Sequence, residues 1–218
     1  MMFNRTLLTA ASLAGMTLLA ACSFSPSSAE VEKASATMLQ QSFQARGIAT
    51  LDRLDQDQAN AACATADIEG KPLDEKLSKA IEDANMKTVK WPSDGKFLGD
   101  WKQGEAIAQS GRGLTWTDKA GDANGGNCYN CHQISKEEIS FGTLGPSLYQ
   151  YGKLRGVTDP NSPAARPMLE YTWGKLWNAR AYNACSQMPR VGHKGILTET
   201  QLRHVMALLL DPASPVNK

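Results

Sequence analysis

The sequence feature that most constrains this chain is the pentapeptide Cys128-Tyr129-Asn130-Cys131-His132. Two thiols three positions apart, with an imidazole directly after the second, match the pattern by which c-type haem is attached to protein. The following histidine then reaches the iron from below the ring. No second CxxC and no HxxxH occurs, which disfavours a zinc site, and no βαβ pattern surrounds the motif, which disfavours a thioredoxin-like redox pair. The motif predicts one covalently bound haem c on Cys128 and Cys131, with His132 as an axial iron ligand.

The first 21 residues have the features of an export signal. Arg5 gives a positively charged start, and the uncharged apolar run from Leu7 to Ala21 is shorter than the roughly 20 residues of a membrane-spanning helix. The run meets Cys22 in Leu-Ala-Ala-Cys, which resembles the lipobox of bacterial lipoproteins and predicts that Cys22 is lipidated. Plain secretory cleavage after Ala29 is the alternative. Both interpretations place the chain in the periplasm, and the lipobox adds a membrane anchor.

The composition limits the partners. The chain has 23 Lys and Arg against 22 Asp and Glu, and removal of a leader that contains one Arg and no acid takes the formal charge from +1 to 0. Because no basic run is present either, we expect no nucleic-acid partner.

The two cysteines outside the motif and the lipobox are Cys63 and Cys185. An oxidising compartment favours a disulfide between them. Two separate buried thiols remain the alternative, because sequence does not show how close the two Cα atoms lie. A bridge would pin the N-terminal part of the chain to the haem pocket.

The chain reads as a series of helices, and we expect an all-α protein. A signal peptide over 1–21 precedes a Ser-, Ala- and Pro-rich tether over 22–36, a helical N-terminal extension over 37–95 and a haem domain over 96–218. Within the haem domain, helices are predicted over 100–110, 169–184 and 198–210, the last beginning with the Thr198–Gln201 pattern of a capping box. Gly104 lies inside the first of these helices, where glycine is unfavourable unless another helix approaches closely.

The second axial ligand decides whether the iron can bind an external molecule. Met188 is the best candidate, because it lies between Cys185 and Pro189 in a stretch with little backbone freedom. His193 and Met168 remain alternatives. Arg180 and Arg190 are candidates to pair with haem propionates, since guanidinium groups suit carboxylates, and solvated surface positions are the alternative for both.

At this point the sequence resembles class I cytochromes c. The CYNCH motif, the Gly142–Leu148 stretch (GTLGPSL) and the Met-Pro-Arg segment occur in the order of that fold. The resemblance implies that an early helix crosses the last helix, and that the carbonyl group of Pro146 accepts a hydrogen bond from the iron-bound His132.

A longer resemblance is to SoxX, the monohaem subunit of the SoxAX cytochrome. It is carried by the stretches GIATLDRLDQ (47–56), GNCYNCHQ (126–133), GTLGPSL (142–148) and YTWGKLWNARAYNACSQMPRVG (171–192). The resemblance implies the electron-accepting subunit of a heterodimeric L-cysteine S-thiosulfotransferase. In that family the SoxA partner carries the catalytic cysteine, and thiosulfate is joined to a cysteine of a carrier protein, SoxYZ.

Two other functions remain open at this stage. A free-standing periplasmic electron shuttle needs little beyond the haem domain, so the extension over 37–95 counts against it. A peroxidase or gas sensor needs an open iron position, which Met188 argues against. A downstream electron acceptor is implied by every interpretation in which the chain passes electrons on.

Overall fold

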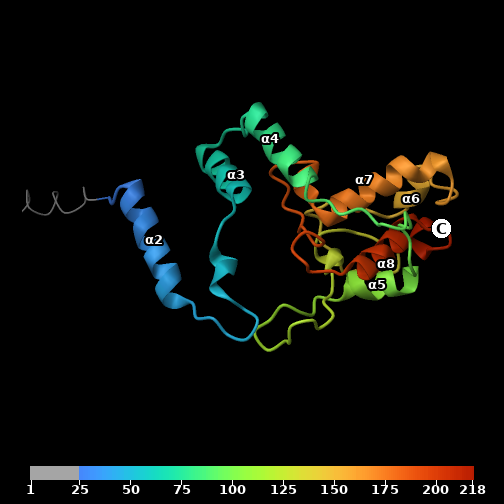
Figure 1. Ribbon diagram of the computed structural model, residues 1–218, viewed down its shortest axis with the longest axis horizontal. Coiled ribbons are helices and arrows are strands. Elements are labelled where there is room, and N and C mark those ends of the chain that lie inside the picture. Colours follow the sequence, from blue (N-terminus) through green and yellow to red (C-terminus); the bar gives the residue numbers. More distant parts are fainter. Residues whose placement is uncertain (1–24) are drawn as a thin grey trace, which may run out of the picture. The chain divides into compact units, whose positions relative to one another are not determined.

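The computed structural model describes residues 25–218, and the predicted signal peptide and Cys22 lie outside this range. The described residues form helices and no β-strand, as Figure 1 shows, which confirms the all-α prediction. The α-helices are α2 (Ser28–Ser42), α3 (Gln58–Glu69), α4 (Glu75–Met86), α5 (Trp101–Gln109), α6 (Tyr151–Leu154), α7 (Arg166–Trp177) and α8 (Glu199–Leu210). Short 3₁₀ helices are η1 (Leu51–Leu54), η2 (Cys128–Asn130), η3 (Pro163–Ala165), η4 (Ala179–Ala181) and η5 (Pro215–Asn217).

The chain forms two compact units, divided between residues 44 and 45. The first contains α2, all of whose residues are exposed. This helix begins at Ser28, inside the stretch predicted to be a tether, because Ser27 and Glu30 form a reciprocal capping box. The second unit contains α3 to α8, so residues 45–95 and residues 96–218 fall in the same compact unit.

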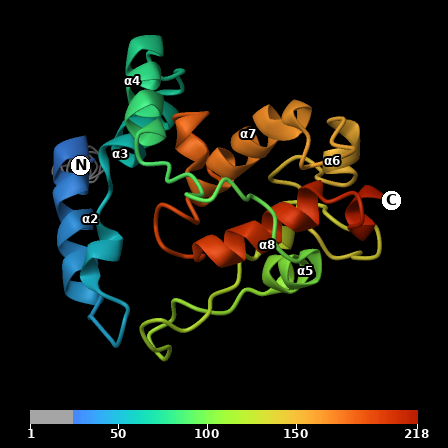
Figure 2. The same ribbon diagram turned by 45° about the vertical axis from the view of Figure 1, so that its right-hand side comes forward.

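Within the second unit, α5 and α8 cross in close contact (Figure 2). Gly104 faces the backbone of His204, and a Cβ atom at Gly104 would lie 2.1 Å from the carbonyl oxygen of His204. No side chain fits at that distance, so the glycine allows the two helix backbones to meet. The backbone N–H of Gly99 also donates to the carbonyl of Arg203 at 2.8 Å, just before α5 begins.

The main core is built on the apolar face of α8, where Leu202 and Met206 are fully buried. Trp173 of α7 is also fully buried in this core, and such a side chain contributes on the order of 2–3 kcal/mol of hydrophobic stabilisation. The indole N–H groups of Trp173 and Trp177 donate to the carbonyl groups of Lys90 and Thr88 at 2.8 and 3.0 Å. These bonds fasten the segment before α5 along α7.

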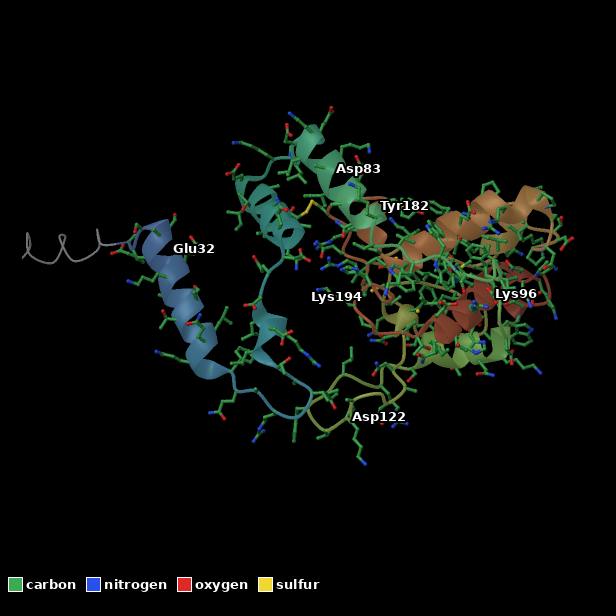
Figure 3. All side chains as sticks on the ribbon, viewed as in Figure 1. Glu32, Asp83, Lys96, Asp122, Tyr182 and Lys194 are labelled. Carbon is green, nitrogen blue, oxygen red and sulfur yellow. A yellow bond between two sulfur atoms is a disulfide. The ribbon has the colours of Figure 1, made fainter. Side chains whose placement is uncertain are left out.

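A smaller core joins α3 and α4 to the segment before Met188, through Ala59, Ile81 and Ala184. Here Cys63 of α3 and Cys185 form a disulfide with their Cα atoms 5.5 Å apart, drawn in yellow in Figure 3. The bridge spans 122 residues of sequence. The predicted disulfide is therefore confirmed.

Candidate functional site

The Cys128–His132 segment forms one tight turn. Residues Cys128–Asn130 are the 3₁₀ helix η2, and the backbone N–H groups of Cys131 and His132 both donate to the carbonyl of Cys128, at 3.1 and 3.0 Å. The preceding Asn127 has a φ of 50°, in the left-handed region that Asn tolerates better than most residues. The short x-x spacing between the two cysteines thus places both on a single turn.

This turn is fastened to the end of α5. The N–H of Gly126 donates to the carbonyl of Ile107 at 2.8 Å, and the N–H of Asn127 donates to the carbonyl of Ser110 at 2.9 Å. Because α5 is itself held against α8, the position of the turn is set by the helix crossing at Gly104.

The thiols of Cys128 and Cys131 are free and half-buried. Burial raises the pKa of the Cys128 thiol to about 11. The thiolate is the reactive form of cysteine, so Cys128 is a weak nucleophile at neutral pH.

The imidazole of His132 lies against the Gly142–Leu148 loop. Its Nδ1 is 2.7 Å from the carbonyl oxygen of Pro146. Because a carbonyl can only accept, Nδ1 carries the proton and Nε2 is left with a free lone pair. A Cβ atom at Gly145 would lie 2.1 Å from Cε1 of the ring, so only glycine allows the loop to approach this closely. The contact between Pro146 and His132 implied by the cytochrome resemblance is present.

The segment that carries Met188 is held by Cys63 of α3 and by Asp57, the residue that caps the start of that helix. Met188 is half-buried and packs against the main core, three residues after the disulfide cysteine Cys185. On either side of it, Arg180 Nη1 and Arg190 Nη2 donate to the two carboxylate oxygens of Asp57, at 3.1 and 2.5 Å. The two arginines predicted to be candidates for haem propionates thus bind a carboxylate of this chain.

The environment of Asp57 stabilises its ionised form. Burial alone would raise the pKa of this carboxyl, but hydrogen bonds from the Asn60 N–H and from Arg190, with the charges of Arg190 and Arg180, lower the pKa below its usual value. Arg180 is buried, with 8% of its surface exposed, and it also donates to the side-chain oxygen of Asn60. Two mostly buried cations therefore share one carboxylate.

The two alternative ligands have other surroundings. His193 is exposed and its backbone N–H donates to the carbonyl of Trp177 at 2.9 Å; partial burial and the nearby charges of Arg190 and Lys194 lower the pKa of its ring. Met168 is half-buried in the first turn of α7, with its sulfur 4.0 Å from the hydroxyl of Tyr151.

A side-chain pair between the buried Tyr129 of the turn and the half-buried Glu105 of α5 was missed at the sequence level. The hydroxyl of Tyr129 donates to Oε1 of Glu105 at 2.7 Å and accepts from the N–H of Ser135 at 3.1 Å. Burial and the bond to Glu105 raise the pKa of this phenol above its usual value. The two residues are 24 positions apart in sequence, so no local pattern predicts the pair, which depends on how the turn docks on α5.

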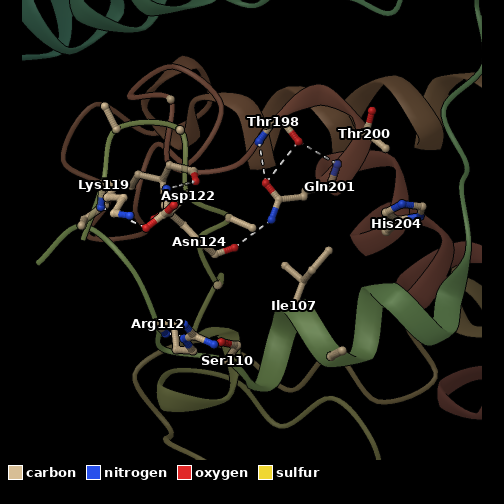
Figure 4. Close-up of a pocket in the computed structure, with 18 of the residues that line it drawn as sticks. Ile107, Ser110, Arg112, Lys119, Asp122, Asn124, Thr198, Thr200, Gln201 and His204 are labelled. Atoms are coloured by element: carbon tan, nitrogen blue, oxygen red, sulfur yellow. Dashed lines mark hydrogen bonds between the residues drawn. The ribbon is translucent and has the colours of Figure 1, made fainter. Parts of the chain in front are cut away.

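A cavity of about 790 Å³ lies on α5, the start of α8 and the Arg112–Gly125 loop (Figure 4). Cys128, Cys131, His132 and Met188 do not line this cavity. Figure 4 shows Gln201 between Thr198 and Asn124, and its side-chain amide donates to the carbonyl of Asn124 at 2.8 Å. The cavity therefore contains none of the predicted site residues, although Ile107 and Ser110, whose carbonyl groups hold the turn, line it.

The predicted cofactor requires a correction. Residues 25–218 contain no group of three or more His, Cys, Asp or Glu side chains that could hold a metal ion. At the turn, the side chains diverge: the Cys128 sulfur lies beside Gly126, whereas the His132 ring faces Gly145 and Pro146. Cys63 and Cys185 form the only bonded cysteine pair in this part of the chain. These findings contradict the prediction of one covalently bound haem c.

Comparison with known proteins gives limited information. No protein-family model matches the chain. A protein of Aquifex aeolicus (strain VF5), described as an uncharacterized lipoprotein, is 36% identical over 132 residues, which is 60% of this chain and 59% of the relative. The chain thus spans less than two thirds of the length of that lipoprotein. In the described part of the chain, no helix has both the length and the apolar character needed to cross a membrane.

Proposed function

We propose that this chain is the electron-accepting subunit of a heterodimeric complex in the cell envelope that joins thiosulfate to a cysteine of a carrier protein, an L-cysteine S-thiosulfotransferase of the SoxAX kind. The turn Cys128–His132 is the part of the chain that we assign to electron transfer, with Cys128 and Cys131 taking up two electrons as a disulfide that is reduced to the two thiols. The partner subunit supplies the catalytic cysteine, a SoxYZ-type carrier visits transiently, and a further acceptor receives the electrons.

The observation that carries the proposal is the contact between His132 and Pro146. It joins two of the four stretches that resemble SoxX, and it is the contact that the resemblance to class I cytochromes c implies for these positions. The helix crossing at Gly104 is the second arrangement that this resemblance implies. We therefore also propose the class I cytochrome c fold for residues 96–218.

The other two stretches meet elsewhere in the same unit. Asp57, one residue beyond the first stretch, binds Arg180 and Arg190 of the last stretch. All four stretches of the resemblance thus lie in one compact unit. His132 and Pro146 join two of them, and the ion pairs of Asp57 with Arg180 and Arg190, near the Cys63–Cys185 disulfide, connect the other two.

The reaction is consistent with two chains that have different roles, one providing the reactive cysteine and the other accepting electrons. Joining the partner's cysteine to thiosulfate forms one S–S bond and releases two electrons and the thiol proton, so this step needs a reactive thiolate and an electron acceptor. A carrier thiolate then attacks the bound thiosulfate at its outer sulfur, which forms the carrier's S–S bond, breaks the partner's and releases the partner's thiolate. The thiol of Cys128 is kept protonated by burial, and Cys63 and Cys185 are bonded to each other. Because these groups are poor nucleophiles, we place the reactive cysteine on the partner.

We further propose that the chain is anchored to the periplasmic side of a membrane by a lipid on Cys22. The lipobox-like sequence supports this, and the Aquifex aeolicus relative is described as a lipoprotein. A lipid anchor needs no spanning helix.

The decisive experiment is purification of the chain from its native host, with mass analysis of the proteins that copurify and of the intact chain. We expect a second subunit in fixed ratio, thiosulfate-dependent electron transfer when carrier is added, and loss of that transfer in Cys128→Ser and Cys131→Ser. The intact mass also reports any covalent addition at the two sulfurs and at Cys22. Recovery of a lone chain that passes electrons without thiosulfate and carrier would instead establish the free-standing shuttle.

A further inference from the structure

The carboxylate of Glu105 is unusual among the buried polar groups of this protein. Its Oε2 is the one enclosed side-chain nitrogen or oxygen in the described residues that has no hydrogen-bond partner. Buried polar groups are nearly always paired, because an unpaired one loses its bonds to water without replacement. We therefore ask which contacts of the other carboxylate oxygen keep Glu105 in this position.

The other oxygen, Oε1, accepts two hydrogen bonds. One comes from the hydroxyl of Tyr129 at 2.7 Å and the other from the side-chain amide of Gln109, one turn along α5, at 3.0 Å. The Tyr129 hydroxyl also accepts from the N–H of Ser135 at 3.1 Å. Hydrogen bonds thus connect Glu105 of α5 to Tyr129, and Tyr129 to the backbone of Ser135, three residues after His132.

Tyr129 occupies the first position between the two cysteines, and its ring is buried. Backbone bonds already fasten the start of the turn to α5, through Gly126 and Asn127. The bond from Tyr129 to Glu105 adds a side-chain attachment inside the turn itself. With this bond in place, η2 is fixed to α5 on both sides of Cys128.

We propose that Glu105 is a positioning residue for the Cys128–Cys131 turn, and that it acts by holding the hydroxyl of Tyr129. The role needs an acceptor at Oε1 and does not need the negative charge. The proposal builds on the proposed function, because it takes this turn as the part of the chain assigned to electron transfer.

The test is the rate at which Cys128 is alkylated in the full-length chain, made by cell-free synthesis in a glutathione buffer so that Cys63–Cys185 forms. Iodoacetamide labelling at one fixed pH is followed by peptide mass spectrometry. Since a half-buried thiol reacts through local opening, loosening the turn raises the rate. We expect about a 10-fold rise in Glu105→Ala and in Tyr129→Phe.

Two further variants separate positioning from general destabilisation. Glu105→Gln keeps an acceptor for the Tyr129 hydroxyl, and we expect it to restore labelling to within about 3-fold of the unmodified chain. Tyr151→Phe removes another buried phenol hydroxyl, which is bonded to Thr172 at 3.0 Å and remote from the turn in sequence, and is expected to leave Cys128 unchanged.

The proposal is overturned if Tyr129→Phe labels at the rate of the unmodified chain, or if Glu105→Gln labels as fast as Glu105→Ala. If Glu105→Ala does not fold, the comparison of Cys128 labelling rates in Tyr129→Phe and Tyr151→Phe still tests the proposal. The labelling needs no partner and no turnover. A failure here therefore leaves the copurification result standing, and a lone chain in that experiment leaves the labelling result standing.

Discussion

The carboxylate of Asp57 and the guanidinium of Arg180 lie 3.1 Å apart although 123 residues separate them. Arg190 binds the other oxygen of the same carboxylate. Removing the charge of Asp57 would leave two mostly buried arginines facing each other without a counter-charge. We expect Asp57→Asn to lower the free energy of unfolding by about 2 kcal/mol, less than the 3–5 kcal/mol of a fully buried pair because Asp57 is about one-third exposed. Urea denaturation measures this, with Asp55→Asn as the control for loss of a nearby exposed carboxylate.

The same cluster predicts a pH dependence. The pKa of Asp57 is lower in the folded chain than its usual value of 3.8, so its contribution to stability is complete above that value. The contribution is lost as the pH falls below 3.8 through the folded-state pKa, because the unfolded chain then binds the proton more readily. Thermal unfolding between pH 5 and pH 2 should show a smaller loss of stability in Asp57→Asn than in the unmodified chain. Parallel curves for the two proteins would contradict the ion-pair cluster.

The disulfide should contribute strongly to the stability of the second unit. Because Cys63 and Cys185 close a long loop, the bond restricts the unfolded chain, and its removal is expected to cost roughly 2–5 kcal/mol. The double variant Cys63→Ser/Cys185→Ser, compared by calorimetry with the oxidised chain, measures the effect. If reduction changes the stability of the double variant as much as that of the unmodified chain, the bond is not responsible.

Gly104 offers a test of the helix crossing. A methyl group there would lie 2.1 Å from the His204 carbonyl, so Gly104→Ala forces α5 and α8 apart in spite of the better helix propensity of alanine. We expect a loss of about 2 kcal/mol or more, of the size seen when well-packed cores are overfilled. Gln103→Ala, on an exposed position of the same helix, is the matched control and should change stability by less than about 0.5 kcal/mol.

The loop that contacts His132 predicts a specific ring tautomer. With Nδ1 donating to Pro146, neutral His132 should carry its proton on Nδ1, a form that nitrogen-15 NMR distinguishes from the alternative. Gly145→Ala would displace the loop and should remove this preference. A proton on Nε2 in the unmodified chain would show that the contact with Pro146 is not made.

Much of the secondary structure follows from local sequence. The capping pattern of Thr198 and Gln201 fixes the start of α8, and its apolar face needs no partner to be recognised. The same local rule applies to the stretch over 22–36 predicted to be a tether, where the Ser27–Glu30 capping box starts α2, a helix that the prediction did not include. A Ser- and Ala-rich composition outweighed a specific pair of residues in that prediction.

The sequence by itself determined the all-α class and the cysteine pair available for bridging, and it singled out the two thiols and the imidazole of the predicted site. Only the tertiary structure decided which side chains meet: Asp57 with Arg180 and Arg190, Tyr129 with Glu105, and His132 with Pro146. It also overturned the predicted haem, since side chains adjacent in sequence face different neighbours in the fold. The physical reason is that capping, periodicity and turn chemistry act over a few residues, whereas these contacts depend on helices packing across gaps of up to 133 residues.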